Sequence, residues 1–402
     1  MTFRKSLRIG RSLAVLGALA GLLAACTSAE ASGVKVKPGG RSFTVAAAGD
    51  VLIHPELVEQ AAKDAKKTGK GEAGLDFGPL MAGVKPVVSK ADLAICHMET
   101  PVGTPKGPFE GYPDFLVPPQ ILTTLKDVGY DTCSTASNHT FDHGLKAVKR
   151  TLDAMDKVGL GHTGSARTPD EAEQINVRDV NGVKVAHLSF SWESFGHPTP
   201  EKEKWAFNKT GTDAIKGAEA RARKKGAEVV ILSIHWGNEH YNEPTLPQLR
   251  LAEWLSEKTG IDLVIGHHSH VVQPIQKVNG TWVAYSLGNQ VARHSVPSGL
   301  TEEGAIGWFE FRETTDGGWD VSARYRTTLV DIPPEVEPGE DLPEGVVQDH
   351  RVVDVQQVLD SADGLSDERL ARYRLAEDRT RGFLYNRGAP GGDGLEQLSS
   401  GT

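Results

Sequence analysis

A histidine-rich segment is the strongest chemical signal in this 402-residue sequence. In Gly266-His267-His268-Ser269-His270, three imidazoles stand within four residues, directly after the apolar run 263–265. Two histidines at positions i and i+2 of a loop can direct both side chains toward one cation. We therefore interpret this segment as part of a metal site rather than as a structural feature of a strand end.

Four further apolar runs end at residues that commonly bind metals. Each group has a structural explanation when taken alone: a Gly-Asp turn, a surface glutamate, a helix N-cap or a satisfied core histidine. Five strand ends that all deliver such residues are hard to explain by chance, and we interpret them as one site. The additional residues are Asp50 after the run 42–48, Glu99 after 91–95, Asn138, His139 and Asp142 after 130–135, and His235 after 229–234.

The types of side chain in this set indicate which chemistry the site could support. Carboxylate, amide and imidazole groups occur without a thiolate, which suits Mn²⁺, Fe or Zn²⁺ and favours a two-metal site over a structural zinc. Two divalent cations can activate a water and stabilise charge that develops on a phosphoryl oxygen. A histidine beside them that is not a ligand can protonate the leaving group.

The elements that must position these residues form an alternating pattern. Apolar runs typical of strands alternate with helical patterns at 55–67, 118–128, 145–158, 212–225 and 246–258. This order predicts an α/β fold with helices on both faces of the sheet structure. In such folds the carboxyl ends of the strands form the crevice in which ligands bind. Further strands are expected at 301–330.

The first 25 residues have the composition of a secretory signal. Basic residues precede an apolar run at 13–25, which ends in Leu23-Ala24-Ala25-Cys26. This run is short for a membrane span, and the small residues before Cys26 suit cleavage. The segment resembles the bacterial lipobox, whose cysteine carries a diacylglycerol anchor. We expect a signal peptide at 1–25, lipidation of Cys26, a flexible tether over 26–42 and a location at the extracytoplasmic face of the bacterial membrane. A signal peptide with an incidental cysteine is the alternative.

Charge and cysteine usage narrow the classes of partner. The formal net charge is −9, and the signal segment contributes only cations, so the exported chain is more acidic still. Such a chain is not expected to bind nucleic acid, and an acidic polymer would need a local binding site. Cys96 and Cys133 each follow an apolar run, and either a disulfide or two buried thiols fits them.

Taken in order, the motifs resemble the CapA family of capsule and poly-γ-glutamate synthesis proteins, within the calcineurin-like metallophosphoesterase superfamily. The match extends from about Phe43 to Ile332. The resemblance implies a four-layer α/β/β/α sandwich of the metallo-dependent phosphatase type over 43–332. The remainder, 333–402, is then a C-terminal appendage that we expect to end in a disordered tail from about Gly388. The motifs are Gly49-Asp50, His97-Met98-Glu99, Asn138-His139-Thr140-Phe141-Asp142-His143-Gly144, His235-Trp236-Gly237-Asn238-Glu239, Gly266-His267-His268-Ser269-His270 and Tyr285-Ser286-Leu287-Gly288-Asn289.

The resemblance also implies a role for each matching residue. Asp50 and His270 would bind a first metal and Glu99 would bridge the two ions. Asn138, His235 and His268 would bind the second. His139 would lie nearest the leaving group, and Asp142 and Glu239 would line the cleft.

The sequence departs from the family pattern at several of these positions. His97 replaces the usual Asn, and Glu99 stands where ordinary phosphoesterases have a bridging Asp. Leu52 replaces the histidine of the Asp-x-His motif, which weakens the first site unless His54 substitutes for it.

Three functions are compatible with these observations. The first is metal-dependent hydrolysis or transfer on poly-γ-glutamate, a related acidic envelope polymer or a phosphoester. The second is a non-catalytic accessory role beside a membrane polymer synthase. The third is a general extracytoplasmic phosphoesterase or nucleotidase, for which a base-stacking surface would have to come from aromatic residues such as Trp192, Phe195, Trp205 and Trp236.

Overall fold

The computed structural model describes residues 35–192, 197–294, 298–336, 342–361, 363–387 and 394–399. The predicted signal peptide, the predicted lipidation site Cys26 and most of the predicted tether lie outside the described residues. So does Phe195. Within the described part of the chain, no helix combines the length and the hydropathy that a membrane crossing requires.

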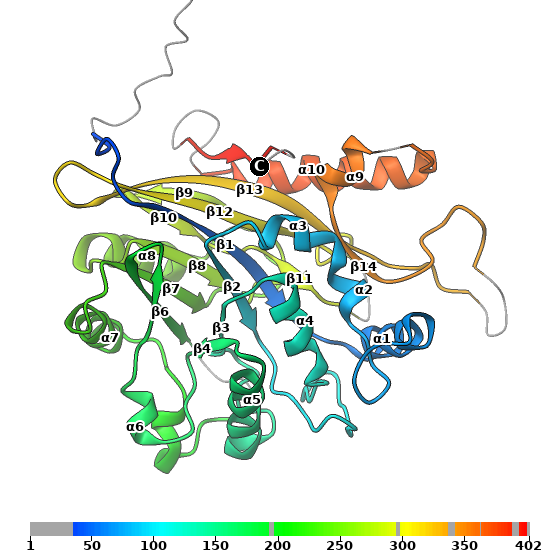
Figure 1. Ribbon diagram of the computed structural model, residues 1–402, viewed down its shortest axis with the longest axis horizontal. Helices are drawn as coiled ribbons and strands as arrows, with labels where there is room; N and C mark the ends of the chain where they lie inside the picture. The colour runs from blue at the N-terminus through cyan, green and yellow to red at the C-terminus, as the bar shows by residue number, and fades with distance from the viewer. Residues whose placement is uncertain are drawn as a thin grey trace, which may run out of the picture. The chain divides into compact units, whose positions relative to one another are not determined.

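Two β-sheets form the centre of the fold (Figure 1). The first has nine strands in the order β14-β13-β12-β1-β2-β3-β4, with β11 paired to β1 and β15 paired to β13. The second has six strands in the order β5-β6-β7-β8-β10-β9. The nine-stranded sheet comprises β1 Ser42–Val51, β2 Leu93–Met98, β3 Thr132–Ser134, β4 Gly161–Thr163, β11 Asn289–Val291, β12 Glu303–Glu313, β13 Trp319–Asp331, β14 Arg351–Asp354 and β15 Glu396–Gln397. The six-stranded sheet comprises β5 Asn176–Val180, β6 Val183–Ser191, β7 Val229–His235, β8 Leu263–His267, β9 Ile275–Val278 and β10 Thr281–Ala284.

Alternation of side chains along the central strands explains why the two sheets pack face to face. In β1, Val45 and Ala47 join a core cluster that also contains Val229 and Leu263 of the other sheet. The intervening Ala46 belongs to a different cluster, on the face that the helices cover. Successive residues of a strand point to opposite faces, so a strand buried on both sides must be apolar throughout.

Helices cover the outer face of each sheet (Figure 1). Residues of α1, α4 and α5 pack in the cluster beside the nine-stranded sheet, and residues of α7 and α8 pack beside the six-stranded sheet. The predicted α/β fold with two sheets between helical layers is therefore confirmed. The helices are α1 Pro55–Thr68, α2 Gly78–Met81, α3 Lys85–Val88, α4 Gln120–Val128, α5 Gly144–Val158, α6 Pro169–Ala172, α7 Thr212–Lys224, α8 Leu246–Lys258, α9 Val355–Asp360 and α10 Asp367–Leu384, with 3-10 turns at Ala82–Val84 and Glu201–Ala206.

The C-terminal appendage packs on the long hairpin of β12 and β13 (Figure 1). Tyr373 and Ala376 of α10 form a small apolar cluster with Leu329 and Val355. We expected the chain beyond Gly388 to be disordered, but residues 394–399 differ from that expectation. Their strand β15 pairs with β13. Leu398 is buried and packs in a core cluster, so this part of the Gly-rich tail is ordered.

A disulfide joins Cys96 and Cys133 and decides between the two readings of these cysteines. The residues are direct partners in the parallel pairing of β2 and β3, with Cα atoms 4.4 Å apart. Cys96 immediately precedes His97, and Cys133 immediately precedes Ser134.

Replacing both cysteines with alanine is expected to lower the free energy of unfolding by roughly 4 kcal/mol, because the bond closes a long loop in the unfolded chain. The two cysteines are separated by 37 residues. Urea unfolding, with the wild type in the presence and absence of dithiothreitol as control, measures the change. Identical unfolding midpoints for all samples would contradict the prediction.

Candidate metal centre

The carboxyl ends of five parallel strands deliver the predicted site residues to one edge of the sandwich. Asp50 lies near the end of β1, Glu99 directly follows β2, and Asn138 follows β3. His235 and His267 are the last residues of β7 and β8 in the other sheet. The strands extend further than the sequence analysis predicted, so Asp50, His235 and His267 lie within the sheets rather than in loops.

Asp50, Glu99 and His270 form the centre of the cluster. Each offers a ligand atom, and these atoms all lie within 4.8 Å of one another. His270 Nδ1 is 3.3 Å from Asp50 Oδ2, and its Nε2 is 3.7 Å from Glu99 Oε1. The structure thus brings together the three residues that the sequence analysis assigned to the first metal and the bridge.

Glu99 provides the test of whether these residues fit a metal. Both of its carboxylate oxygens are buried and have no hydrogen-bond partner among the described residues. Burial raises the pKa of Glu99 well above its usual range. Removing a carboxylate from water without hydrogen bonds is costly unless a cation compensates it. Glu99 therefore fits the position of a metal ligand.

His235 has the support that a metal-binding histidine needs. Its Nδ1 is 3.0 Å from His97 Nε2, and His97 Nδ1 is 2.7 Å from Ser134 Oγ. If each Nδ1–H donates along this series, His235 Nε2 keeps its lone pair, 2.9 Å from Asn138 Oδ1 and 3.9 Å from Glu99 Oε1. Burial lowers the pKa of both histidines well below the usual value, which favours the neutral form that a metal requires.

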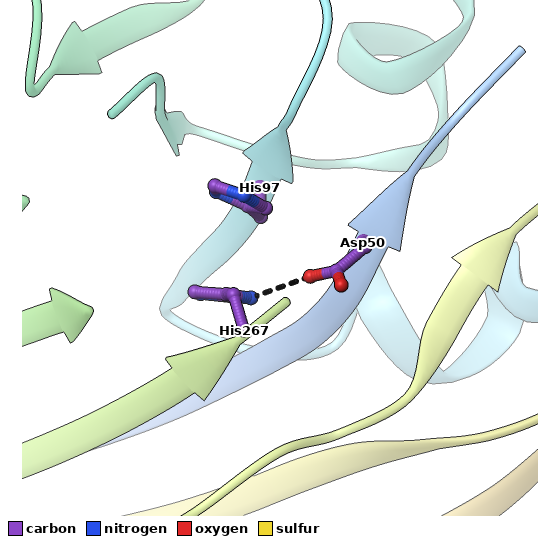
Figure 2. A group of neighbouring side chains, drawn as sticks. All are labelled: Asp50, His97 and His267. Carbon is purple, nitrogen blue, oxygen red and sulfur yellow. Dashed lines mark hydrogen bonds and ion pairs between the residues drawn. The ribbon is translucent and has the colours of Figure 1, made fainter. Parts of the chain in front are cut away.

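Asp50 is held in its ionised form by groups from the histidine segment (Figure 2). His267 Nδ1 lies 3.0 Å from Asp50 Oδ1, and the His268 backbone N–H donates to Oδ2 at 3.0 Å. Burial alone would raise the pKa of Asp50, but hydrogen bonds from His267 and His270 lower it well below the usual value. The His267 ring also stacks on the His97 ring, with centroids 4.1 Å apart.

The sequence analysis gave neither His97 nor His267 a role of its own in binding the metals. With Asp50 they form a second group whose potential ligand atoms lie within 4.8 Å of one another. Because their contacts to Asp50, His235 and Ser134 already use most of their ring nitrogens, we interpret them as residues that orient the ligands. The replacement of Asn by His at position 97 was the available signal.

A third group lies toward the cleft and contains His268, His270 and Glu239. Burial, followed by the charge of His270, lowers the pKa of His268 to about 4. Glu239 is exposed. The sequence analysis placed Glu239 in the cleft lining, and the structure brings it within reach of the ligands as well.

His139 and Asp142 form a pair at the wall of the same cleft. His139 Nδ1–H donates to Asp142 Oδ2 at 2.7 Å, and the Phe115 backbone N–H donates to the same oxygen at 2.7 Å. His139 lines a cleft of about 500 Å³ together with Glu239 and His270. A carboxylate on Nδ1 leaves Nε2 as the atom that can exchange a proton with a bound substrate.

His54 does not take the place of the missing Asp-x-His histidine in this arrangement. Its Nδ1 accepts the Arg293 backbone N–H at 3.2 Å, and its ring packs edge-on against Phe115. Among the described residues, it belongs to none of the groups that could hold a metal ion.

Two of the clustered histidines have left-handed backbone conformations. The φ angle is 94° at His268 and 55° at His270. Non-glycine residues rarely adopt this region, and such residues concentrate at functional sites. The conformation lets His268 face His235, with ring centroids 4.5 Å apart, while His270 faces Asp50 and Glu99.

Metal binding is expected to strengthen by about tenfold per pH unit between roughly pH 6 and 9. Burial alone would lower the pKa of His270, but Glu99 and Asp50 raise it to about 10, so the metal-free His270–Glu99 pair holds at least one proton at neutral pH. A metal must displace that proton, and displacement becomes easier as pH rises. Calorimetric titration in buffers of different ionisation enthalpy measures the proton release. Affinity that is independent of pH would contradict the prediction.

Comparison with known families shows to which family the chain belongs. Residues 44–294 match the model of the bacterial capsule synthesis protein PGA_cap. The chain belongs to this family. The matched segment includes most of β1, the whole histidine segment and β11, so the PGA_cap region contains every residue assigned to the metals.

Curated relatives carry names that agree with the PGA_cap family. The chain is 29% identical over 259 residues to the PGA biosynthesis protein CapA of Bacillus subtilis, covering 62% of this chain and 64% of that protein. It is 31% identical over 175 residues to the capsule biosynthesis protein CapA of Bacillus anthracis, covering 43% and 42%. A Mycobacterium tuberculosis protein named "probable polyglutamine synthesis accessory protein" is 27% identical over 222 residues, covering 50% of this chain and 55% of that protein. The aligned segments thus span less than two thirds of each relative.

Solved structures with a similar chain course include a phosphoesterase and a nucleotidase. The calcineurin-like phosphoesterase YfkN of Bacillus subtilis is 15% identical, with a TM-score of 0.39 and coverage of 86% of this chain and 99% of that one. The NAD nucleotidase of Haemophilus influenzae is 12% identical, with a TM-score of 0.43 and coverage of 85% and 61%.

Proposed function

We propose that this protein is a lipid-anchored, extracytoplasmic member of the PGA_cap family whose two-metal site hydrolyses a bond in an acidic envelope polymer. Poly-γ-glutamate is the proposed polymer, because the sequence motifs resemble those of poly-γ-glutamate synthesis proteins and the Bacillus subtilis relative is named a PGA biosynthesis protein. The observation that carries the proposal is Glu99, a buried carboxylate that lies between two histidine Nε2 atoms and has no hydrogen-bond partner in the described part of the chain.

The residues present divide naturally between two cations of the Mn²⁺, Fe or Zn²⁺ type. Asp50 and His270 would hold one, Glu99 would bridge, and the second would be held by Asn138, His235 and His268. When bound, such a pair supplies an activated water and neutralises charge that develops at the scissile group.

The chain's own groups perform the remaining tasks. Asp142 holds His139 in one orientation, so His139 Nε2 can give a proton to the departing group.

The buried Arg293 also lines the cleft, and its Nε has no hydrogen-bond partner among the described residues. Among the described residues, the one ion pair of Arg293 is a 3.6 Å contact to the exposed Glu335. A guanidinium in this position gives an otherwise acidic protein a local site for a substrate carboxylate or phosphate.

A non-catalytic accessory role beside a membrane polymer synthase is the second candidate. It is favoured by the name of the Mycobacterium tuberculosis relative, an accessory protein, and by the departure from the usual bridging Asp. In that role the metal site would bind polymer carboxylates or stabilise the fold.

The nucleotidase reading has less support in the cleft. None of the described tryptophans lines it: Trp236 is fully buried, and Trp192 and Trp205 pack against core clusters. Tyr112 and Phe115 are the aromatic carbocycles at the cleft.

Elemental analysis combined with activity assays tests the proposal. The full-length protein is assayed with added Mn²⁺ on p-nitrophenyl phosphate, bis-p-nitrophenyl phosphate and poly-γ-glutamate. About two metals per chain and metal-dependent turnover are expected. Bound metal without turnover on any substrate would favour the accessory role, and absence of metal would refute the assignment of the site.

A further inference from the structure

We propose that the C-terminal helix α10 is a positioning element of the metal centre, although it lies outside the segment that the family model matches. It acts through Arg372 and Arg379, which hold the loop 298–303, and through Asn289, which this loop holds against His270. The inference rests on the proposed function insofar as it requires that His270 binds a metal.

The first step is the contact between Asn289 and His270. Asn289 Oδ1 lies 3.0 Å from His270 Nδ1 and accepts its N–H. Asn289 Nδ2 donates to the His270 carbonyl oxygen at 3.2 Å, so one side-chain amide forms hydrogen bonds with both the ring and the backbone of His270. This arrangement places the proton on Nδ1 and leaves Nε2 free toward Glu99, as metal binding requires.

The second step is the contact between Asn289 and the loop that follows it. Asn289 Nδ2 also donates to the Thr301 carbonyl oxygen at 2.9 Å. The start of β12 also packs closely against Asn289. A Cβ atom added at Gly304 would lie only 2.2 Å from the Asn289 carbonyl oxygen. The position of the Asn289 amide therefore depends on where residues 298–304 lie.

The third step is the attachment of this loop to α10. Glu303 is only 2% exposed, and Arg372 Nη1 donates to its Oε1 at 2.6 Å while Arg379 Nε donates to its Oε2 at 3.2 Å. Both arginines also donate to the Gly299 carbonyl oxygen, at 3.1 and 2.5 Å. The two arginines stand seven residues apart, two helical turns, so they project from the same face of α10.

A purely structural role for α10 predicts a different outcome. Tyr373 and Ala376 bury apolar surface against β13 and α9, and that packing needs neither arginine. If α10 only covers the hairpin, loss of the arginines lowers stability and leaves metal binding unchanged. If α10 positions His270, metal affinity and coordination change even where the protein stays folded.

Cobalt titration of the metal-free, full-length protein separates the two roles. In Arg372→Gln/Arg379→Gln, the Kd for Co²⁺ at the site that includes His270 is expected to rise about 10- to 100-fold, with a changed visible absorption spectrum. Asn289→Ala should show the same defect. Arg369→Gln is the matched control, because Arg369 lies on α10 but contacts Asp331 and Tyr373 instead of the loop. Glu303→Gln, which keeps the size of the side chain, replaces the double variant if that variant does not fold.

The outcomes are distinct. Wild-type affinity and spectrum in the folded double variant would overturn the inference, as would an equal loss in Arg369→Gln. If the wild-type protein itself binds no Co²⁺, the proposed two-metal function fails first. If the wild type binds Co²⁺ and the loop and arginine variants bind it with the same affinity and spectrum, the positioning role fails and the proposed two-metal function stands.

Discussion

Replacing His270 with alanine is expected to abolish metal-dependent turnover, by at least about a thousandfold, or ~4 kcal/mol of transition-state stabilisation. His270 belongs to two of the potential ligand groups, and its ring faces both Asp50 and Glu99. Without it, two buried carboxylates would share the first position with no imidazole between them. Elemental analysis of the purified variant should show the loss of at least one metal, and phosphodiester and poly-γ-glutamate assays measure turnover.

His162→Ala is the matched control for this variant. His162 lies on β4 and pairs with the half-exposed Asp156, and it does not line the cleft. It should keep wild-type metal content and turnover. A His270→Ala protein that retains both metals and full activity would refute the assignment of His270.

Replacing His139 with alanine is expected to lower kcat by roughly 10²- to 10⁴-fold while both metals stay bound, because the change removes a proton donor rather than a ligand. His139 contacts Asp142 and belongs to none of the metal-binding groups of the described residues. Asp142→Asn should lower kcat in the same direction, since an amide holds the His139 tautomer less well. Steady-state kinetics and metal analysis of both variants measure the effects.

The same variant separates the catalytic and accessory functions in cells. If the protein acts by hydrolysis, His139→Ala should reduce polymer production as strongly as deletion of the protein. Full polymer export by cells that carry only His139→Ala would contradict the catalytic proposal and support the accessory role.

The sequence predicted much of the site because its residues follow strand ends. Asp50, Glu99 and His235 each stand after an apolar run, and the carboxyl ends of parallel strands meet at one edge. The two-sheet α/β fold could be predicted for the same reason, from alternating runs and helical patterns together with the family motifs.

The parts that the sequence did not predict depend on contacts between distant segments. The contact of His97 with His235 joins two sheets and has no local pattern in the sequence. Asn289 was recognised only as part of a motif, since its role depends on a loop and a helix that follow it. The ordered strand β15 was not predicted, because a two-residue strand in a Gly-rich tail is too short to show a periodic pattern.

The proposed metal ligands come from both sheets, and this distribution has a consequence for the internal motions of the protein. Asp50 lies in β1 and Glu99 follows β2 of the nine-stranded sheet, whereas His235 lies in β7 and His268 follows β8 of the six-stranded sheet. A bound cation would therefore cross-link the two halves of the sandwich at one edge. Backbone amides of β1, β2, β7 and β8 should then exchange with deuterium more slowly when metal is present, while amides of the outer helices α5 and α7 should exchange at nearly the same rate in both states.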